Sequence, residues 1–379
     1  MRHLYFDYNA TTPIAPSVQA AMAPLLCEHF GNPSSSHALG RAAAEAVEDA
    51  RGQIALLLGC DPDEIVFTSG GTESNNLALK GVMLGQLPAA GGHLVISALE
   101  HPSVVEPARF LERLGYDLTI AGASGQGVVQ PAAVRAAIRP DTRLVSVMHA
   151  NNEVGAIQPL RQIAAICHEH QIPLHTDASQ SVGKIRTLVD ELEVDLLSIA
   201  GHKMYAPKGV GALYVRRGVE LEPLLHGAGH EAGWRAGTEN VASIAGLGRA
   251  ASLAAKALDQ NYERLTSLRD RLWQRLVAEI GNPLVMHSAL AERLPNTLSV
   301  SFPGVDGHEL LARIPELCAS TGSACHSGVE AMSPTLAAMG ISAQQARGTV
   351  RLSVGWYTTE EEVDRAASLL VGAWEAVRG

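Results

Sequence analysis

Short apolar runs alternate with amphipathic stretches over the first two thirds of the chain. Six short runs are mainly apolar, at 64–68, 94–97, 144–149, 173–176, 195–200 and 211–215. Before and between them lie stretches in which apolar residues recur at helical spacing, at 41–58, 74–81, 102–114 and 159–170. Continuous apolar runs are typical of strands buried on both faces, so we predict an α/β fold with a large, doubly wound, mostly parallel sheet.

The pattern changes after about residue 255. Residues 256–280 are predicted to form one long amphipathic helix, because their leucines fall mostly on one face. The remaining stretches favour alternating, half-exposed strands at 296–302 and 349–354, and helices at 306–314 and 359–377. We therefore predict two domains, a large domain over 15–255 and a smaller α+β domain built from 1–14 and 256–379.

Composition narrows the class of protein. The chain has 379 residues, of which 46% are hydrophobic and 18% charged, enough for a substantial buried core. Its formal net charge of −10 argues against binding to nucleic acid or to an anionic membrane surface. The first residues lack the apolar segment of a signal peptide, and no window reaches the roughly 18 apolar residues of a membrane span. These features predict a cytoplasmic protein.

The five cysteines are spaced neither as a disulfide framework nor as a zinc-binding pair. Cys325 differs from the others because it lies among small residues between two glycines, at 321–328. That setting predicts a mobile loop with an exposed thiol. His168 and His170 are two residues apart and so point off different faces of a helix, and no metal site is predicted.

Polar residues follow the predicted strands, where an open parallel sheet binds its ligands. They are found at 69–76, 100–102, 151–153, 177–180 and 200–203. The first group opens a helix with two glycines, which offers backbone N–H groups to an anion, but it lacks the sequence of a nucleotide-binding P-loop. Each group alone fits a turn, a helix cap or a surface lysine equally well.

Together the strand ends supply an anion cradle, an aromatic ring, an amide, a carboxylate and a lysine. Pyridoxal 5'-phosphate requires such a set: a cradle for its phosphate, a lysine for the Schiff base, and a carboxylate at the pyridine nitrogen. The carboxylate keeps that nitrogen protonated, which makes the ring an electron sink. An NAD site would not need the lysine, and a metal site would need convergent ligands. The pattern therefore predicts pyridoxal 5'-phosphate as the cofactor.

Motifs along nearly the whole chain resemble those of the cysteine desulfurases, pyridoxal-phosphate enzymes of the class V aminotransferase superfamily with fold type I. They occur in the family's order at 7–13, 30–34, 68–76, 149–155, 175–183, 201–203, 206–211, 235–240 and 320–325. The loop around Cys325 is similar to that of the NifS/IscS-like group I, which serves nitrogenase and iron–sulfur cluster assembly. The Gly-His-His-Cys loop of the other group is absent.

The resemblance implies a role for each matching residue. Lys203, Cys325 and His101 are the implied catalytic residues. Lys203 would form the Schiff base and move the Cα proton, and His101 would stack on the ring whose nitrogen pairs with Asp177. The other implied cofactor contacts are Gly71, Thr72 and His202 at the phosphate, and Asn152 and Gln180 near the phenolic oxygen. Thr238 would reach the phosphate in the partner subunit of a homodimer.

One implied contact departs from the usual family pattern, and another has two possible partners. Members often have a serine where this chain has Ala200, and Ser198 is the implied substitute, one pleat back on the same strand face. Arg351 and Asn32 would hold the substrate carboxylate. Arg351 alternates with apolar neighbours and so faces away from them, which favours a carboxylate partner, either a substrate or a structural ion pair.

The implied reaction converts L-cysteine to L-alanine and leaves the sulfur as a persulfide on Cys325, for transfer to an acceptor protein. Iron–sulfur cluster assembly, tRNA thiolation and DNA phosphorothioation all remain open as destinations, as does the role of His326. Selenocysteine lyase and cysteine sulfinate desulfinase are the alternative activities on the same fold.

Overall fold

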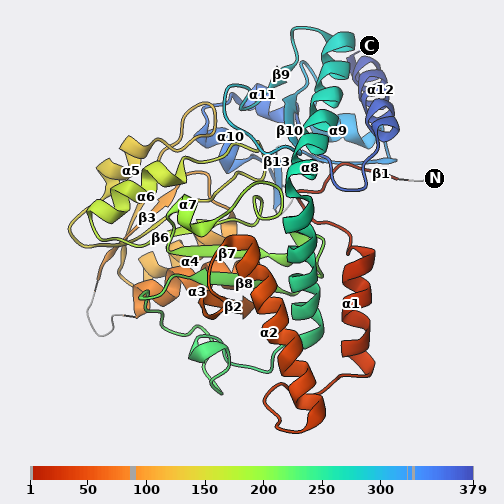
Figure 1. Cartoon of the computed structure of the whole chain (residues 1–379). Helices are drawn as coiled ribbons and strands as arrows, with labels where there is room; N and C mark the ends of the chain where they lie inside the picture. Colours follow the sequence, from red (N-terminus) through yellow and green to blue (C-terminus); the bar gives the residue numbers. More distant parts are fainter. Residues whose placement is uncertain (1–2, 86–90, 322, 327–328, 379) are drawn as a thin grey trace.

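A seven-stranded sheet forms the centre of the larger part of the molecule (Figure 1). The computed structural model describes residues 3–85, 91–321, 323–326 and 329–378, except for the side chains of 323–331. In spatial order the strands are β2 (Ile65–Thr68), β8 (Gly211–Val215), β7 (Leu196–Ala200), β6 (Leu174–Asp177), β5 (Thr142–Ser146), β3 (His93–Ser97) and β4 (Asp117–Ala121). Strand β8 is antiparallel to both neighbours and the other pairs are parallel, which confirms the predicted sheet.

Helices cover both faces of this sheet, and the strand side chains alternate between the two. Along β2, Ile65 and Phe67 pack in one apolar cluster and Val66 packs in another. The first cluster contains side chains of α1 (Pro16–Cys27), α2 (Ala38–Leu58), α5 (Pro131–Ala137), α6 (Leu160–Glu169), α7 (Val189–Leu192) and the first half of α8 (Val241–Ile280). The second contains side chains of α3 (Gly71–Leu84) and α4 (Pro102–Arg113). Burial on both faces explains the continuous apolar runs.

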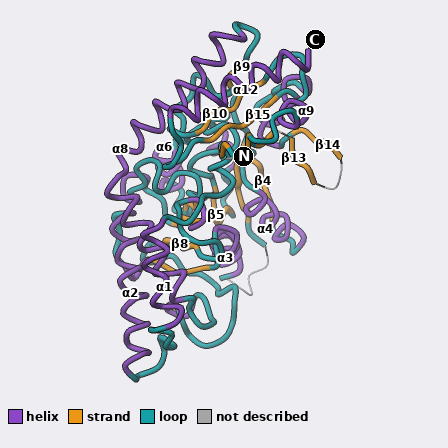
Figure 2. The backbone as a smooth tube through the Cα atoms, turned by 90° about the vertical axis from the view of Figure 1, so that its right-hand side faces the viewer, coloured by secondary structure: helices purple, strands orange, loops and turns teal. Residues whose placement is uncertain are grey.

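The smaller part of the molecule contains an antiparallel sheet in the order β12 (Ser320–Thr321), β15 (Thr349–Ser353), β10 (Thr297–Ser301) and β9 (Val285–Met286). Strand β1 (Leu4–Tyr5) pairs with β11 (Leu317–Cys318), and β13 (Ser323–His326) pairs with β14 (Val329–Met332). Its helices are α9 (Gly307–Ala312), α10 (Pro334–Ala338), α11 (Ala343–Arg347) and α12 (Glu360–Arg378). Figure 2 shows the β13–β14 hairpin on the opposite side of the molecule from α8. Short 3-10 turns are found at Pro62–Glu64, Gly201–Lys203 and Glu231–Gly233.

Helix α8 begins earlier than the predicted residue 256. It runs for 40 residues from Val241 to Ile280. Its first half is rich in small residues and has no stripe of large apolar side chains. The small residues allow α1 and α2 to pack closely against it. A Cβ on Gly248 would lie 2.5 Å from Cα of Ala50 in α2, and one on Gly246 would lie 2.8 Å from Sδ of Met22 in α1. The boundary at 255/256 falls inside α8, and the two-domain division stays a prediction.

Helix α8 is the one helix among the described residues that is long and apolar enough to cross a membrane. Of that apolar window, 56% is buried within the protein. Its first half packs in the same apolar cluster as α1 and α2, and its second half packs with α12. Core packing therefore accounts for its hydropathy.

The prediction that β10 and β15 are half exposed is wrong. Every residue of β10 is buried, and Arg351 is the one residue of β15 that is partly exposed. Their apolar faces pack against α8 and α12, whereas the polar face contacts the N-terminal segment, where Asn9 donates to Oγ1 of Thr297 at 2.8 Å. Hydroxyl-bearing residues thus alternate with apolar ones although both faces are covered.

We expect alanine substitutions at two glycines to change stability in opposite directions. A Cβ on Gly211 would lie 2.4 Å from the backbone oxygen of Ile199 and 2.6 Å from Cα of Gly70. Overpacking of this kind costs roughly 1–3 kcal/mol, so Gly211→Ala should destabilise the protein. A Cβ on Gly52 in α2 meets no atom of the described residues within 4 Å, and Gly52→Ala should stabilise by about 0.5–1 kcal/mol. Denaturant unfolding checks both, and shifts of the same sign would contradict this account.

Candidate functional site

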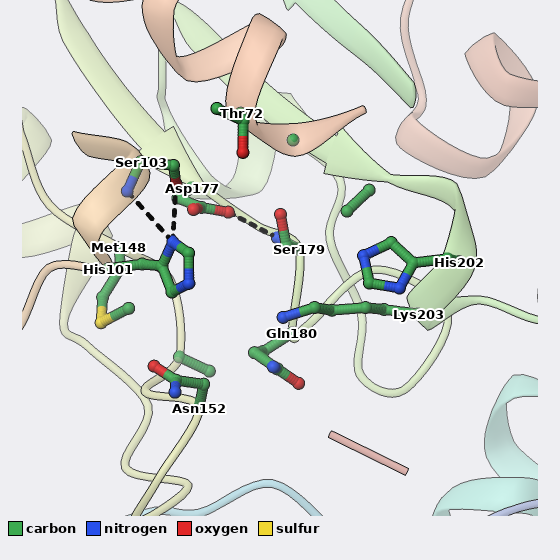
Figure 3. Close-up of a pocket in the computed structure, with 13 residues that line it drawn as sticks. Thr72, His101, Ser103, Met148, Asn152, Asp177, Ser179, Gln180, His202 and Lys203 are labelled. Atoms are coloured by element: carbon green, nitrogen blue, oxygen red, sulfur yellow. Dashed lines mark hydrogen bonds between the residues drawn. The ribbon is translucent and has the colours of Figure 1, made fainter. Parts of the chain in front are cut away.

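One cavity lies beyond the carboxyl ends of the central strands, and side chains from five strand ends meet around it (Figure 3). The residues that line it are Gly71, Thr72, His101, Ser103, Met148, Ala150, Asn152, Asp177, Ser179, Gln180, Ala200, His202 and Lys203. They include most of the cofactor contacts named from the sequence. Because neighbouring parallel strands end at the same edge of the sheet, segments more than a hundred residues apart reach one place.

The start of helix α3 forms one wall of the cavity. Gly70 has a φ of 144°, a conformation that favours glycine, and the helix begins at Gly71. A Cβ on Gly71 would lie 2.9 Å from Oγ of Ser179 and 3.2 Å from Cβ of Ala200. The first N–H groups of a helix have no partner within it and point at whatever lies before it. This wall can therefore bind an anion such as a phosphate group.

Asp177 supplies a buried negative charge at the end of β6. Its carboxylate accepts hydrogen bonds from the backbone N–H of Ser179 at 2.9 Å and from Nδ2 of Asn75 at 2.8 Å. Burial alone would raise the pKa of this carboxyl, but these two donors and the charge of Lys203 hold it below its usual value. Asp177 is thus an anion at neutral pH and can pair with a protonated ring nitrogen.

Lys203 lies in the 3-10 turn that follows β7, beside His202. Burial lowers the pKa of its amine to about 8, against the opposing effect of Asp177. With this pKa about one tenth of the amine is neutral at pH 7, and the neutral form can act as a nucleophile or a base. Burial also lowers the pKa of His202 to about 4, and its Nδ1 lies 3.1 Å from Oγ1 of Thr11.

Lys184 is a buried residue of this region that the sequence analysis did not single out. Its Nζ donates to Oε1 of Gln180 at 2.9 Å and to Oδ1 of Asn9 at 3.3 Å. Nε2 of Gln180 in turn donates to the backbone oxygen of Asn9 at 2.9 Å. These bonds fix the Gln180 amide with its nitrogen available to the cavity. Lys184 follows the matched motif 175–183 directly, but a lone lysine in a sequence is usually at the surface.

Arg351 lies next to the cavity and already has a carboxylate partner. Its Nη2 contacts Oδ1 of Asp7 at 2.6 Å and Oγ of Ser320 at 2.9 Å, and its Nη1 donates to the backbone oxygen of Asn152 at 3.2 Å. Nε of Arg351 is buried without a hydrogen-bond partner among the described residues. In the structure Arg351 therefore forms a structural ion pair with Asp7, and its Nε–H group has no partner among the described residues.

The structure places Ser198 away from the cavity, which corrects its predicted role as a phosphate ligand. Its side chain is fully buried and Oγ lies 3.0 Å from Nε2 of His175, whose Nδ1 lies 2.8 Å from Oγ of Ser146. The cavity is lined instead by Ala200, one pleat further along β7. Ser198 is engaged in a hydrogen-bonded row beneath the site.

Three predicted residues lie elsewhere. Asn32 and Thr238 are exposed and are not among the residues that line the cavity, and Oδ1 of Asn32 accepts from the N–H of Ser34. The backbone of Cys325 is in β13, paired with Glu330 of β14, so this part of the predicted loop is one strand of a two-stranded hairpin. The Cys325 side chain, like that of His326, lies outside the described part of the chain.

The chain is similar to known proteins over nearly its whole length. The family model described as "Aminotransferase class-V" matches residues 4–366. A protein named "Cysteine desulfurase IscS" from Dictyoglomus turgidum is 45% identical over 379 residues, covering 100% of this chain and 96% of the relative. A solved structure titled "NIFS-LIKE PROTEIN" has a TM-score of 0.91 at 37% identity and covers 100% of both chains. Another, titled "SspA in complex with cysteine", has a TM-score of 0.83 at 39% identity over 94% of this chain and 99% of that one.

We expect Lys184 to make the stability of the apoprotein rise with pH. Burial, Lys203 and Arg351 lower its pKa well below the ordinary value, so between the two pKa values the unfolded chain binds a proton that the folded chain does not. Stability then rises with pH across that window, by up to about 1.4 kcal/mol per pH unit for one group. Lys184→Met should remove this part of the slope of the unfolding free energy. Lys256→Met, at an exposed position on α8, is the matched control, and equal slopes in both variants would contradict the expectation.

Proposed function

The chain belongs to the class-V aminotransferase family, among its cysteine desulfurases, and from this premise we propose which of its residues convert L-cysteine to L-alanine and hold the sulfur. One observation supports the proposal above the others. An ionised, buried carboxylate, a lysine of lowered pKa and the open start of a helix surround one cavity. A binding protein without catalytic activity would need neither the neutral amine nor the buried anion.

Pyridoxal 5'-phosphate fits this set of residues. The start of α3 at Gly71 and Thr72, together with His202, suits its phosphate, and Asp177 suits its ring nitrogen. Gln180 and Asn152 can donate N–H groups to its phenolic oxygen, and the amine of Lys203 can bind its aldehyde. When bound, the cofactor supplies an electron sink for the carbon atom that loses its proton.

Lys203 is the proton carrier in this proposal. A neutral Nζ can take the proton from the substrate Cα, and an amine with a pKa near 8 can return it. Arg351 is the proposed partner of the substrate carboxylate, which would take the place that Asp7 occupies. The buried Nε of Arg351 offers a further donor to that carboxylate. Asn32 is proposed to assist, although it does not line the cavity of its own chain.

Cys325 is the proposed sulfur acceptor within the enzyme. Its thiolate attacks the substrate sulfur, an S–S bond forms and the Cβ–S bond breaks. The electron pair stays with the carbon skeleton, which is protonated to L-alanine. Thiol and L-cysteine thus give persulfide and L-alanine without an external oxidant. Ser320 in β12, the strand that precedes the hairpin of Cys325 in the sequence, contacts Arg351 at 2.9 Å, so the proposed nucleophile follows closely in the chain after a residue of the proposed carboxylate site.

The wider setting is also a proposal. Exposed Thr238 would complete the phosphate site of the partner subunit in a homodimer, and the persulfide would pass to an acceptor protein in the cytoplasm. The similarity to relatives named IscS favours iron–sulfur cluster assembly as the destination of the sulfur.

We expect Cys325→Ser to lower alanine formation from L-cysteine by roughly 100-fold or more, since a nucleophile is lost. Alanine and sulfide are measured with purified, cofactor-loaded protein and a reductant. Cys318→Ser, seven residues upstream in β11, should retain activity. Full desulfuration by Cys325→Ser would refute its role. Turnover of selenocysteine or of a sulfinate by wild type, with none of L-cysteine, would move the assignment to a lyase or desulfinase.

We expect the apoprotein to take up pyridoxal 5'-phosphate covalently at a rate that rises with pH and levels off above about 8. Only the neutral amine attacks an aldehyde, and a pKa of about 8 makes half of Lys203 neutral at that pH. An ordinary lysine would be less than about 1% neutral there. Absorbance after mixing reports the rate, and Lys203→Arg is the control for binding without reaction. A rate that still increases tenfold per pH unit near pH 10 would contradict the lowered pKa.

A further inference from the structure

We propose that His101 is a permanent hydrogen-bond donor to the molecule in the cavity, because the start of helix α4 holds its ring neutral with the proton on Nε2. The proposal rests on the proposed function only for the identity of the bound molecule. His101 directly precedes Pro102, where α4 begins, and its ring lines the cavity (Figure 3).

The position of the ring proton follows from the partner of Nδ1. The backbone N–H of Ser103 donates to Nδ1 of His101 at 3.1 Å, so that the ring caps α4. A backbone N–H can only donate, so Nδ1 carries no proton and the proton of the neutral ring is on Nε2. In Figure 3 that nitrogen is on the side of the ring away from Ser103. A charged ring would direct a second N–H at the positive end of the helix, which disfavours it.

Two further residues support the same proton arrangement. Asp177 can only accept, so the Asn75 amide faces it with its nitrogen, at 2.8 Å from Oδ2. The second hydrogen of that nitrogen goes to Oγ of Ser103, also at 2.8 Å. Because the backbone N–H of Ser103 leaves Nδ1 of His101 without a proton, the Ser103 hydroxyl, 2.8 Å away, directs its own hydrogen at that nitrogen. Asn75 and Ser103 are therefore positioning residues that orient Asp177 and His101 through one amide.

This arrangement limits what His101 can do. The nitrogen left for a ligand already carries a proton, so His101 does not take one from the substrate at that atom. Burial and Lys203 lower the pKa of the ring against the opposing charge of Asp177, which agrees with a neutral state. Proton removal is left to Lys203, and His101 stabilises negative charge on the bound molecule by donating to it.

Nuclear magnetic resonance of the apoprotein labelled with 15N in its histidines tests the proton position directly. We expect the His101 ring to show a protonated Nε2 and a bare Nδ1 throughout the pH range of about 6 to 9. His101→Gln assigns the signals by removing them. A proton on Nδ1, or titration of this ring within the range, would overturn the proposal. The measurement needs neither cofactor nor turnover, so it is independent of the desulfurase mechanism.

Asn75→Ala tests the positioning chain. The Ser103 hydroxyl then loses its donor and is free to turn, so the Nδ1 signal should shift while the tautomer persists through the backbone N–H. Asn76→Ala is the matched control. The Asn76 amide donates to the backbone oxygen of Thr72, so its loss should leave the His101 signals in place. Unchanged signals in Asn75→Ala would show that Asn75 does not act on His101.

Kinetics of the cofactor-loaded enzyme distinguish whether His101 acts as a hydrogen-bond donor or as a base. His101→Gln keeps an N–H group and His101→Phe keeps only a ring, so the glutamine variant should retain kcat/KM at least about tenfold better, the effect of one hydrogen bond to a charged group. Its pH profile should keep the acidic limb of the wild type. Equal losses in the two variants, or an acidic limb that disappears in His101→Gln, would identify a base and overturn the proposal.

Discussion

A buried carboxylate must be given hydrogen-bond donors, and much of the site follows from this need at Asp177. An isolated charge inside a protein costs free energy. The carboxylate oxygens of Asp177 therefore accept hydrogen bonds from the backbone N–H of Ser179 and the side-chain amide of Asn75. Asn75 is itself fully buried at the start of α3, and its second hydrogen goes to Ser103 at the start of α4. Two helices on the same face of the sheet are thereby tied to the end of β6. The anion that suits a cofactor ring also fixes the relative position of the helix that can bind a phosphate and the helix capped by His101.

A second constraint joins the two parts of the chain. Asn9 donates to Thr297 of β10 and to the backbone oxygen of Asn152, and its own backbone oxygen accepts from Gln180. Lys184 and Asn296 both donate to the Asn9 side-chain oxygen. The N-terminal segment is thus held between the large sheet and the small one. This explains the burial of the polar face at the start of β10, since the Thr297 hydroxyl accepts from Asn9, whereas the Ser301 hydroxyl donates to the backbone oxygen of Gln345.

The sequence was informative where a feature leaves a local signal. Continuous apolar runs predicted the buried strands of the large sheet. The residues at the strand ends met in one cavity because parallel strands end at one edge. Strand β4 was missed because it is at the edge of the sheet, with Asp117 and Ile120 exposed, so it has no continuous apolar run. The early start of α8 was missed because Gly246 and Gly248, which allow close helix packing, have a low helix propensity and interrupt the segment.

What the sequence could not give are polar pairings between distant segments. Arg351 pairs with Asp7, Ser198 contacts His175 on the neighbouring strand, and Lys184 donates to Asn9. None of these pairings follows a regular spacing in the sequence, because each depends on segments that come together only in the folded protein. The same pairings set the polarity of the site. Gln180 offers its nitrogen because Lys184 occupies its oxygen, and His101 offers Nε2–H because a helix N–H occupies Nδ1. Hydrogen bonds between residues of the protein thus decide which atoms donate into the cavity.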